Sequence, residues 1–154
     1  MPIVTFPEYA DGVQVLVLNG PNLNLLGKRE PAVYGTATLR QLEDLCRSWG
    51  KDLGLSVSTA QSNHEGELID HLHNSIGRYG GVVLNPGALT HYSYALHDAI
   101  AAIGHPVVEV HISDIASREE WRQNSVISAA CAATISGEGF DGYRRALEVL
   151  AGDG

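Results

Sequence analysis

Apolar side chains recur with two different periods along this chain, and the order of the two periods predicts its architecture. Residues 13–18 form an apolar run with an aliphatic side chain at every position except Gln14, which is typical of a strand buried on both faces of a parallel sheet. Four further runs predict strands at 55–61, 82–84, 107–110 and 132–136. Apolar residues at spacings of three and four predict helices over 38–53, 62–80, 91–103 and a C-terminal stretch that carries Tyr143, Leu147 and Leu150.

Because strands alternate with helices, we expect an α/β protein with a parallel sheet. A chain of 154 residues suits a flavodoxin-like three-layer sandwich with a five-stranded parallel sheet, as a single domain over residues 13–154. Residues 1–12 lack this patterning, and we expect an irregular N-terminal extension there. Two capping patterns predict helix starts, Thr38 with Gln41 and Ser62 with Glu65.

Polar clusters follow three of the expected strands. They lie at residues 19–22, 85–91 and 109–113. The carboxyl ends of parallel strands meet at one edge of a sheet, where open α/β sheets bind their ligands, so we expect these clusters to converge on a site. A long loop that ends at Tyr34 brings Lys28 and Arg29 to the same edge and is a candidate lid.

Composition narrows the possible partners. The formal net charge of −8 weighs against nucleic acid, which binds a clustered basic face. The sequence shows neither a membrane-length apolar run nor a leader pattern, so we expect a cytoplasmic protein that does not bind membranes. Cys46 and Cys131 stand apart, and we expect reduced thiols. The seven histidines lack metal-ligand spacing, so we expect no metal; we place these four in solvent or at helix caps: His64, His71, His73 and His105.

Two pairs of side chains suit acid–base chemistry. Strand alternation puts Glu109 and His111 on the same side, where the carboxylate can orient the imidazole, although a structural histidine fits the same pattern. Tyr34 is a poor base at neutral pH unless a cation such as Arg29 lowers its pKa.

Other residues extend or limit this interpretation. Asn22 and Asn85 either stabilise turns beside proline and glycine or contribute polar groups to the site. The sequence contains neither a nucleotide-binding glycine fingerprint nor a G-x-S-x-G elbow. The residues alone therefore favour an α/β enzyme that performs acid–base chemistry on a small anionic substrate.

Five motifs, in order along the chain, resemble those of type II 3-dehydroquinate dehydratases. They are NGPNLNLLGKREPAVYG, QSNHEGELID, NPGALTHYSYALHDA, EVHIS and REEWR, and the likeness covers residues 13–150. The resemblance implies a flavodoxin-like subunit that assembles as a dodecamer of four trimers and needs no metal or cofactor. It implies dehydration of 3-dehydroquinate to 3-dehydroshikimate through an enolate, in aromatic biosynthesis by the shikimate pathway or in quinate catabolism.

The resemblance also implies roles for the matching residues. Tyr34 would remove the proton beside the ketone, with Arg29 holding the phenolate. His111, oriented by Glu109, would protonate the departing hydroxyl, and Asn22 would stabilise the enolate through an ordered water. The substrate would be bound by Asn85, His91, Arg122, the backbone of Ile112 and Ser113, and Asp98 from a neighbouring subunit.

Four positions depart from the usual motifs. Tyr92 follows the binding histidine, Asp114 replaces an asparagine, and Gln123-Asn124 replace a pair of histidines. Because Asp114 adds negative charge near the expected carboxylate site, we expect altered substrate affinity. Two other functions remain open: a hydrolase that uses His111 with a serine, and a non-catalytic sensor of dehydroquinate or quinate.

Overall fold

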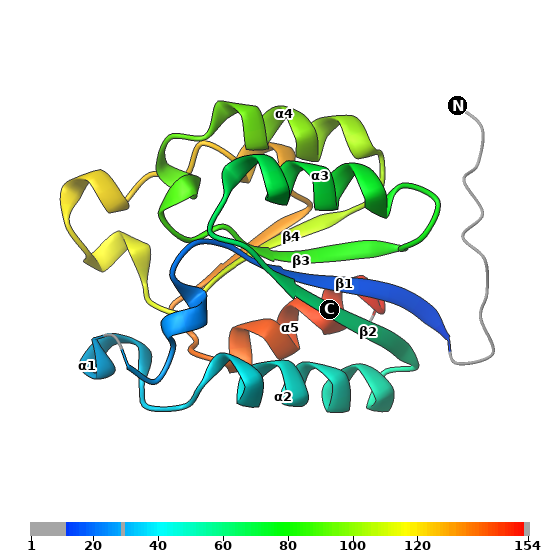
Figure 1. The fold of residues 1–154 in the computed structure, drawn as a ribbon, viewed down its shortest axis with the longest axis horizontal. Helices are drawn as coiled ribbons and strands as arrows, with labels where there is room; N and C mark the ends of the chain where they lie inside the picture. Colours follow the sequence, from blue (N-terminus) through cyan, green and yellow to red (C-terminus); the bar gives the residue numbers. More distant parts are fainter. Residues whose placement is uncertain (1–11, 29, 153–154) are drawn as a thin grey trace.

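Five parallel strands form one sheet at the centre of the molecule (Figure 1). The computed structural model describes residues 12–28 and 30–152, without the side chains of residues 33 and 34. The extension expected over residues 1–12 therefore lies, apart from Gly12, outside the described part. The strands are β1 (Val13–Asn19), β2 (Leu55–Gln61), β3 (Gly81–Asn85), β4 (Val107–His111) and β5 (Ala133–Ser136). Their order is β2-β1-β3-β4-β5 and every pairing is parallel, which confirms the predicted sheet.

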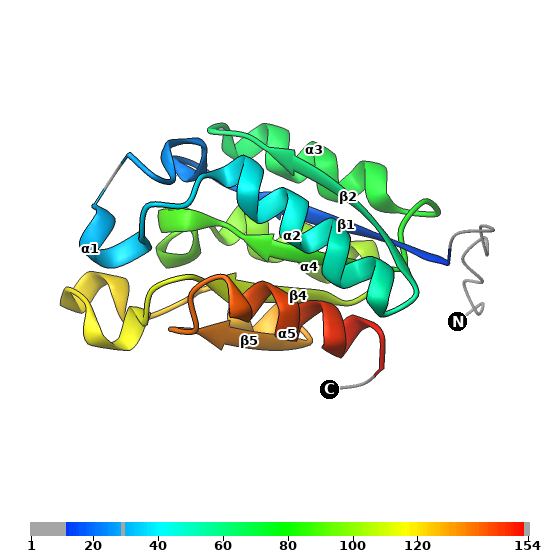
Figure 2. The ribbon, with the colours of Figure 1, turned by 90° about the horizontal axis from the view of Figure 1, so that it is seen from below.

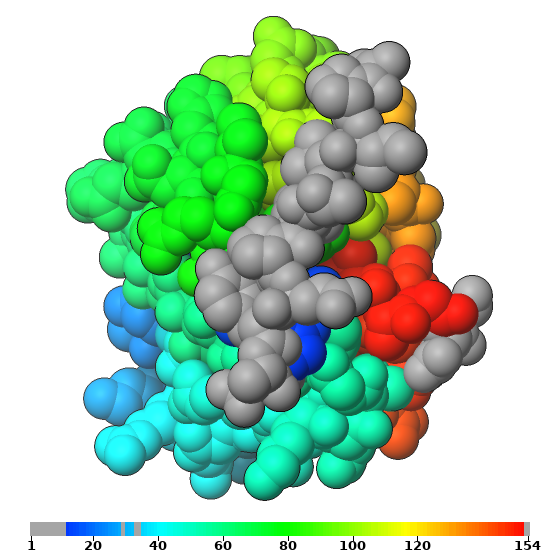
Figure 3. Space-filling view, turned by 90° about the vertical axis from the view of Figure 1, so that its right-hand side faces the viewer, coloured from blue at the N-terminus to red at the C-terminus, as the bar shows by residue number. Residues whose placement is uncertain are grey.

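Helices cover both faces of the sheet and complete the predicted three layers. On one face lie α2 (Leu39–Asp52) and α5 (Asp141–Leu150), and on the other lie α3 (Glu65–Ser75) and α4 (Tyr94–Ile103) (Figures 1 and 2). The expected lid contains a 3-10 turn, η1 (Leu23–Leu25), and a four-residue helix, α1 (Pro31–Tyr34). Figure 3 shows the end of the molecule opposite to α1, where α2, α3 and α5 end.

Each face of the sheet buries its own hydrophobic core. Strand alternation sends Val15, Val17 and Val83 towards α2 and α5, where they meet Leu42 and Leu147. The intervening residues of the same strands pack against α3 and α4 with the following side chains: Leu68, Leu72, Leu96, Ile100 and Ile103. Burial on both faces explains why the central strands are predominantly apolar.

The helix starts show where local sequence patterns hold and where they fail. Thr38 caps α2 as predicted, because its side chain accepts from the Gln41 N–H while Gln41 returns a bond to the Thr38 backbone. The prediction at Ser62 is wrong: α3 follows His64, and the Ser62 hydroxyl instead donates to Glu67 and accepts from the His64 N–H.

Two other predicted boundaries are also wrong. Helix α3 ends at Ser75 rather than near residue 80. Residues Gly87–His91 form a separate 3-10 turn, η2, and α4 begins at Tyr94 because the Ser93 side chain caps it. The segment between β3 and α4, which contains η2, therefore stays at the carboxyl edge of the sheet.

The ends of β1 and β3 are held unusually close together. The Gly20 N–H donates to the Asn85 carbonyl oxygen at 2.7 Å. A Cβ atom at Gly20 would lie 2.7 Å from the Pro86 carbonyl oxygen, so a side chain there would push the two turns apart. Glycine is therefore required at the point where the sheet order reverses.

Both cysteines are free thiols that burial makes weak acids. Cys46 lies inside the core on α2, and Cys131 is half-buried before β5. Burial raises the pKa of each thiol to about 12.

Candidate active site

A polar pocket opens at the carboxyl edge of the sheet, where the chain was predicted to gather its polar clusters. It lies beside the turns that follow β1, β3 and β4, on the left in Figure 1. Seven of the predicted site residues line it: Asn22, Asn85, His91, His111, Ile112, Ser113 and Arg122. These residues come from four separate segments, so the fold assembles the pocket from parts distant in sequence.

At the inner wall of the pocket, His111 and Glu109 form a buried pair. The His111 Nε2–H donates to Glu109 Oε2 across 2.5 Å, and the two side chains are 6% and 0% exposed. Both belong to β4 and point to the same face, as the alternation predicts. With Nε2 committed to Glu109, the other ring nitrogen of His111 is the one available to a ligand.

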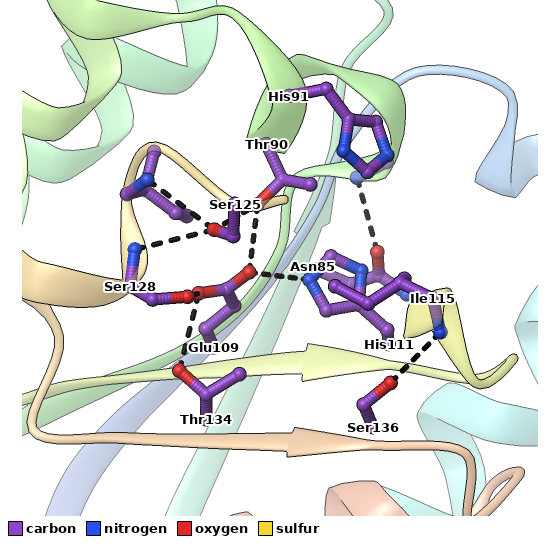
Figure 4. Close-up of polar contacts among 12 residues, drawn as sticks. Asn85, Thr90, His91, Glu109, His111, Ile115, Ser125, Ser128, Thr134 and Ser136 are labelled. Atoms are coloured by element: carbon purple, nitrogen blue, oxygen red, sulfur yellow. Dashed lines mark hydrogen bonds and ion pairs between the residues drawn. The ribbon is translucent and has the colours of Figure 1, made fainter. Parts of the chain in front are cut away.

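Three hydroxyl groups surround the Glu109 carboxylate (Figure 4). Thr90 donates to Oε2 at 2.7 Å, and Ser128 and Thr134 donate to Oε1 at 2.6 Å and 3.3 Å. Burial alone raises the pKa of Glu109, but the hydrogen bond and charge of His111 and the bonds from Ser128 and Thr90 outweigh it and bring the pKa to about 2. Glu109 is therefore a fixed anion behind the imidazole.

His91 faces the pocket from η2 with a defined tautomer. Its Nδ1 lies 2.7 Å from the carbonyl oxygen of Asn124, which can only accept, so Nδ1 carries the proton and Nε2 is an acceptor. Burial lowers the pKa of His91 below its ordinary value, although the Asn124 carbonyl opposes this shift. The ring also contacts Trp121 edge-on, with centroids 5.5 Å apart.

Two arginines supply positive charge on the side of the pocket formed by the 3-10 turns η3 (Ile115–Ser117) and η4 (Glu120–Arg122). Arg122 bonds Glu119 at 2.7 Å, and its guanidinium lies 3.8 Å from the centre of the Trp121 ring. Arg118 donates to the Ser113 hydroxyl at 3.3 Å and pairs with Glu30 at 3.9 Å. This side of the pocket suits an anionic or hydroxylated ligand.

Two asparagines line the pocket near the strand ends: Asn22 in the turn after β1, and Asn85 as the last residue of β3. Asn22 has a left-handed backbone with φ of 71°, which asparagine tolerates, and its N–H donates to Asn63 Oδ1 at 3.0 Å. Asn85 is 3% exposed, and its Oδ1 accepts the Gly87 N–H at 3.1 Å. Asn85 thus makes the turn contact expected from its sequence and also lines the pocket.

Glu109 lies behind His111 rather than in the pocket lining, and the described residues do not place three other predicted site residues in the pocket. Arg29 lies outside the described residues, and so does the side chain of Tyr34, whose backbone ends α1. Asp98 lies on α4 with its side chain 85% exposed, next to His97. The proposed pairing of Tyr34 with Arg29 therefore stays a prediction, as does the role of Asp98.

Sequence reasoning missed several contributors. Arg118 lines the pocket, and its position in a loop edge beside another arginine was the available signal. No sequence signal pointed to Ser128 and Thr134, because they lie 19 and 25 residues from Glu109 along the chain. His105, expected in solvent or at a cap, is 7% exposed and so is not in solvent: its ring bonds the backbone of Ile103, the last residue of α4, and lies 2.8 Å from the Ser75 hydroxyl at the end of α3.

The residues that depart from the usual motifs do not line the pocket, although each site of departure directly follows a lining residue in the sequence. Asp114 is not among its lining residues: the carboxylate accepts the Ala116 N–H at 3.1 Å and caps η3. The Tyr92 side chain is 63% exposed. Gln123 donates to the Arg118 carbonyl and Asn124 supplies the carbonyl that holds His91, so both support the segment that carries the arginines.

The described part of the chain contains no helix with the length and apolar character needed to span a membrane.

The pocket combines a carboxylate-supported imidazole with arginines and polar backbone. This arrangement can transfer a proton to or from a small anionic ligand.

Comparisons with known proteins agree with this chemistry. Residues 13–151 match the family model described as dehydroquinase class II. The chain is 56% identical to a 3-dehydroquinate dehydratase of Deinococcus radiodurans, over 89% of this chain and 96% of the relative, and 55% identical to that of Thermus thermophilus, over 89% and 93%. Its fold is similar to the crystal structure of type II dehydroquinase from Propionibacterium acnes, with a TM-score of 0.88 and 44% identity over 92% of this chain and 98% of that one. The chain belongs to the class II dehydroquinase family.

Proposed function

We propose that this protein is a 3-dehydroquinate dehydratase that eliminates water from 3-dehydroquinate to give 3-dehydroshikimate. The observation that carries the proposal is the buried Glu109–His111 pair at the wall of a pocket that also holds two arginines. Family membership and the high identity to relatives named 3-dehydroquinate dehydratase support it.

The elimination proceeds in two proton transfers. Tyr34, as a phenolate held by Arg29, removes a proton from the carbon beside the ketone, and the electron pair of the C–H bond forms an enolate. Asn22 stabilises the enolate oxygen through an ordered water. When the enolate collapses, the C–O bond to the leaving hydroxyl breaks and His111 protonates that oxygen, so that water departs and a conjugated enone remains.

The anionic Glu109 has a definite part in the second transfer. It stabilises the positive charge of a doubly protonated His111 and holds Nε2, so that the proton leaves from the nitrogen facing the pocket. Because the hydrogen bond and charge of His111 and the bonds from Ser128 and Thr90 keep Glu109 ionised, the carboxyl group does not itself keep the proton.

The remaining pocket residues bind the substrate. We assign its hydroxyls and carboxylate to the Asn85 and His91 side chains, Arg122, and the backbone of Ile112 and Ser113. Asp98 is exposed on α4, and we assign it to the pocket of a neighbouring subunit in a dodecamer of four trimers. The two free thiols fit a cytoplasmic location.

Enone formation tests the proposal directly. Ultraviolet absorbance of the conjugated product is followed with 3-dehydroquinate as substrate and EDTA present, for wild type, Tyr34→Phe and Tyr94→Phe. Tyr34→Phe removes the base and should lower kcat by about 10²- to 10⁴-fold. Tyr94→Phe alters an exposed tyrosine on α4 and should leave kcat unchanged.

Other outcomes have distinct meanings. Wild type that binds 3-dehydroquinate without converting it would favour a sensor. Loss of wild-type turnover in EDTA would contradict the metal-free elimination. Full activity in Tyr34→Phe would require another base.

A further inference from the structure

A buried tyrosine joins the ends of two neighbouring strands beneath the pocket. Tyr143 lies on α5 and is 0% exposed. Its hydroxyl donates to Asn19 Oδ1 at 2.6 Å and accepts from Asn85 Nδ2 at 2.9 Å. Asn19 and Asn85 are paired in register as the last residues of β1 and β3, so both side chains point to the α5 face.

The direction of every bond in this chain follows from one backbone group. The Gly87 N–H can only donate, and it meets Asn85 Oδ1. The amide nitrogen of Asn85 must therefore face Tyr143, whose oxygen accepts from it. The Tyr143 proton is then left for Asn19 Oδ1, and because burial raises the pKa of this phenol far above its ordinary value, that proton is retained.

This network determines what Asn85 offers to the pocket. Its oxygen is bound to Gly87 and one amide hydrogen is bound to Tyr143, so the second amide hydrogen remains for a ligand. Asn85 consequently acts as a donor towards the substrate, and its amide cannot rotate without breaking two hydrogen bonds.

Packing alone does not require this tyrosine hydroxyl. A phenylalanine would fill the same space between α5 and the sheet. Within the described residues, the Asn19 side chain accepts from Tyr143, while its own amide nitrogen is buried without a hydrogen-bond partner. A buried unpaired amide costs stability, which an apolar residue at this position would avoid.

We propose that Tyr143 is a positioning residue that fixes the amide of Asn85 as a hydrogen-bond donor to the substrate. This inference rests on the proposed function, because the bound molecule is taken to be 3-dehydroquinate. Tyr143 acts through Asn85 and touches no reacting atom.

Steady-state kinetics with 3-dehydroquinate test this role. In Tyr143→Phe the Asn85 amide loses its anchor, so we expect KM to rise about ten-fold while kcat changes less than two-fold, since the contact is equal in ground and transition states. In an Asn85→Ala background, Tyr143→Phe should add no further increase in KM. An increase that persists in that background would overturn the proposal.

A matched control separates positioning from stability. Leu147→Ala, one turn along α5, removes buried packing and should lower the urea midpoint without changing KM. If Leu147→Ala raised KM as much as Tyr143→Phe, general loosening of α5 would explain both results and the proposal would fail.

Asn19→Leu provides a second test that keeps the tyrosine. It removes the acceptor that orients the Tyr143 hydroxyl, so KM should rise about three-fold, and an unchanged KM would again contradict the proposal. Wild type is assayed first: a wild type without turnover overturns the proposed function and this inference together. If wild type is active but the effects of Tyr143→Phe and Asn85→Ala on KM add, the inference fails and the proposed function stands.

Discussion

At the scale of single residues, Glu109 illustrates how a carboxylate without solvent contact keeps its charge. Each of its oxygens accepts hydrogen bonds, from His111 and Thr90 on one side and from Ser128 and Thr134 on the other. Saturation by donors replaces the lost water, which explains a pKa of about 2 against an ordinary value of 4.5.

The stability of the fold should therefore depend on pH through Glu109. Its pKa is lower in the folded state, so the ionised group stabilises the fold above about pH 4.5. This contribution is lost as pH falls from about 4.5 towards 2. Urea unfolding of wild type and Glu109→Gln, between about pH 6 and 3, should show wild type losing unfolding free energy more steeply than the variant. Glu120→Gln, at an exposed site, should follow wild type; parallel curves for Glu109→Gln would contradict the assignment.

A second prediction at this scale concerns Asp114. Because its carboxylate caps η3 and does not line the pocket, the altered affinity expected from the sequence no longer follows. Asp114→Asn retains a capping oxygen, and we expect KM for 3-dehydroquinate to stay within about two-fold of wild type. Arg122→Ala, assayed in parallel, should raise KM by at least about ten-fold. A clear fall in KM for Asp114→Asn would restore the charge argument.

The sequence was a good guide to residues whose partners are close along the chain. Glu109 and His111 could be paired because strand alternation is a local rule. The bonds of Tyr143 to Asn19 and Asn85, and that of His105 to Ser75, could not be assigned, because these partners lie between 30 and 124 residues away. Only the folded chain brings such groups together.

At the scale of elements, capping patterns predict a helix start only where the flanking chain permits it. Thr38 and Gln41 form both bonds of the capping box. Ser62 has the same spacing to Glu65, but its hydroxyl is committed to Glu67, and the helix starts two residues later. Apolar periodicity located all five strands and the four longer helices, whereas the boundaries required these side-chain contacts.

Removal of the Thr38 cap should affect stability without affecting the site. Thr38→Ala leaves the Gln41 N–H without its side-chain acceptor and should lower the free energy of unfolding by about 1 kcal/mol. Urea unfolding measures this change, and Thr38→Ser, which keeps the hydroxyl, is the control. Equal losses in both variants would show that the methyl group, rather than the cap, provides the stability.

At the scale of the whole molecule, the pocket depends on three strands ending at a common edge. The order β2-β1-β3-β4-β5 reverses direction between β1 and β3, and the Gly20 contact holds their turns together there. The sequence predicted this convergence from the class of fold. The arginine-bearing turns after β4 have no regular period, so their placement against Glu30 and Ser113 was not predictable.

Assembly can be tested through the exposed Asp98. For the proposed dodecamer, analytical ultracentrifugation should give a molecular mass about twelve times the 16.5-kDa mass of the chain. If Asp98 completes a neighbour's pocket, Asp98→Ala and Tyr34→Phe should each be impaired. Subunits of the two variants are then dissociated, mixed in equal amounts and reassembled. The mixture should regain roughly a quarter of wild-type activity, because roughly a quarter of its pockets receive both an unaltered Tyr34 and an unaltered Asp98. The separately reassembled variants are the controls. No recovery in the mixture would place Asp98 outside the shared site.

The two weakly acidic thiols also make the native chain convenient for spectroscopy. With each pKa near 12, Cys46 and Cys131 hold almost no thiolate at neutral pH and should react slowly with maleimides. A cysteine introduced at the exposed Ala32 of α1 could then carry a fluorophore or spin label while both natural cysteines stay in place. Such a label would test whether the candidate lid moves during turnover in an otherwise unaltered protein.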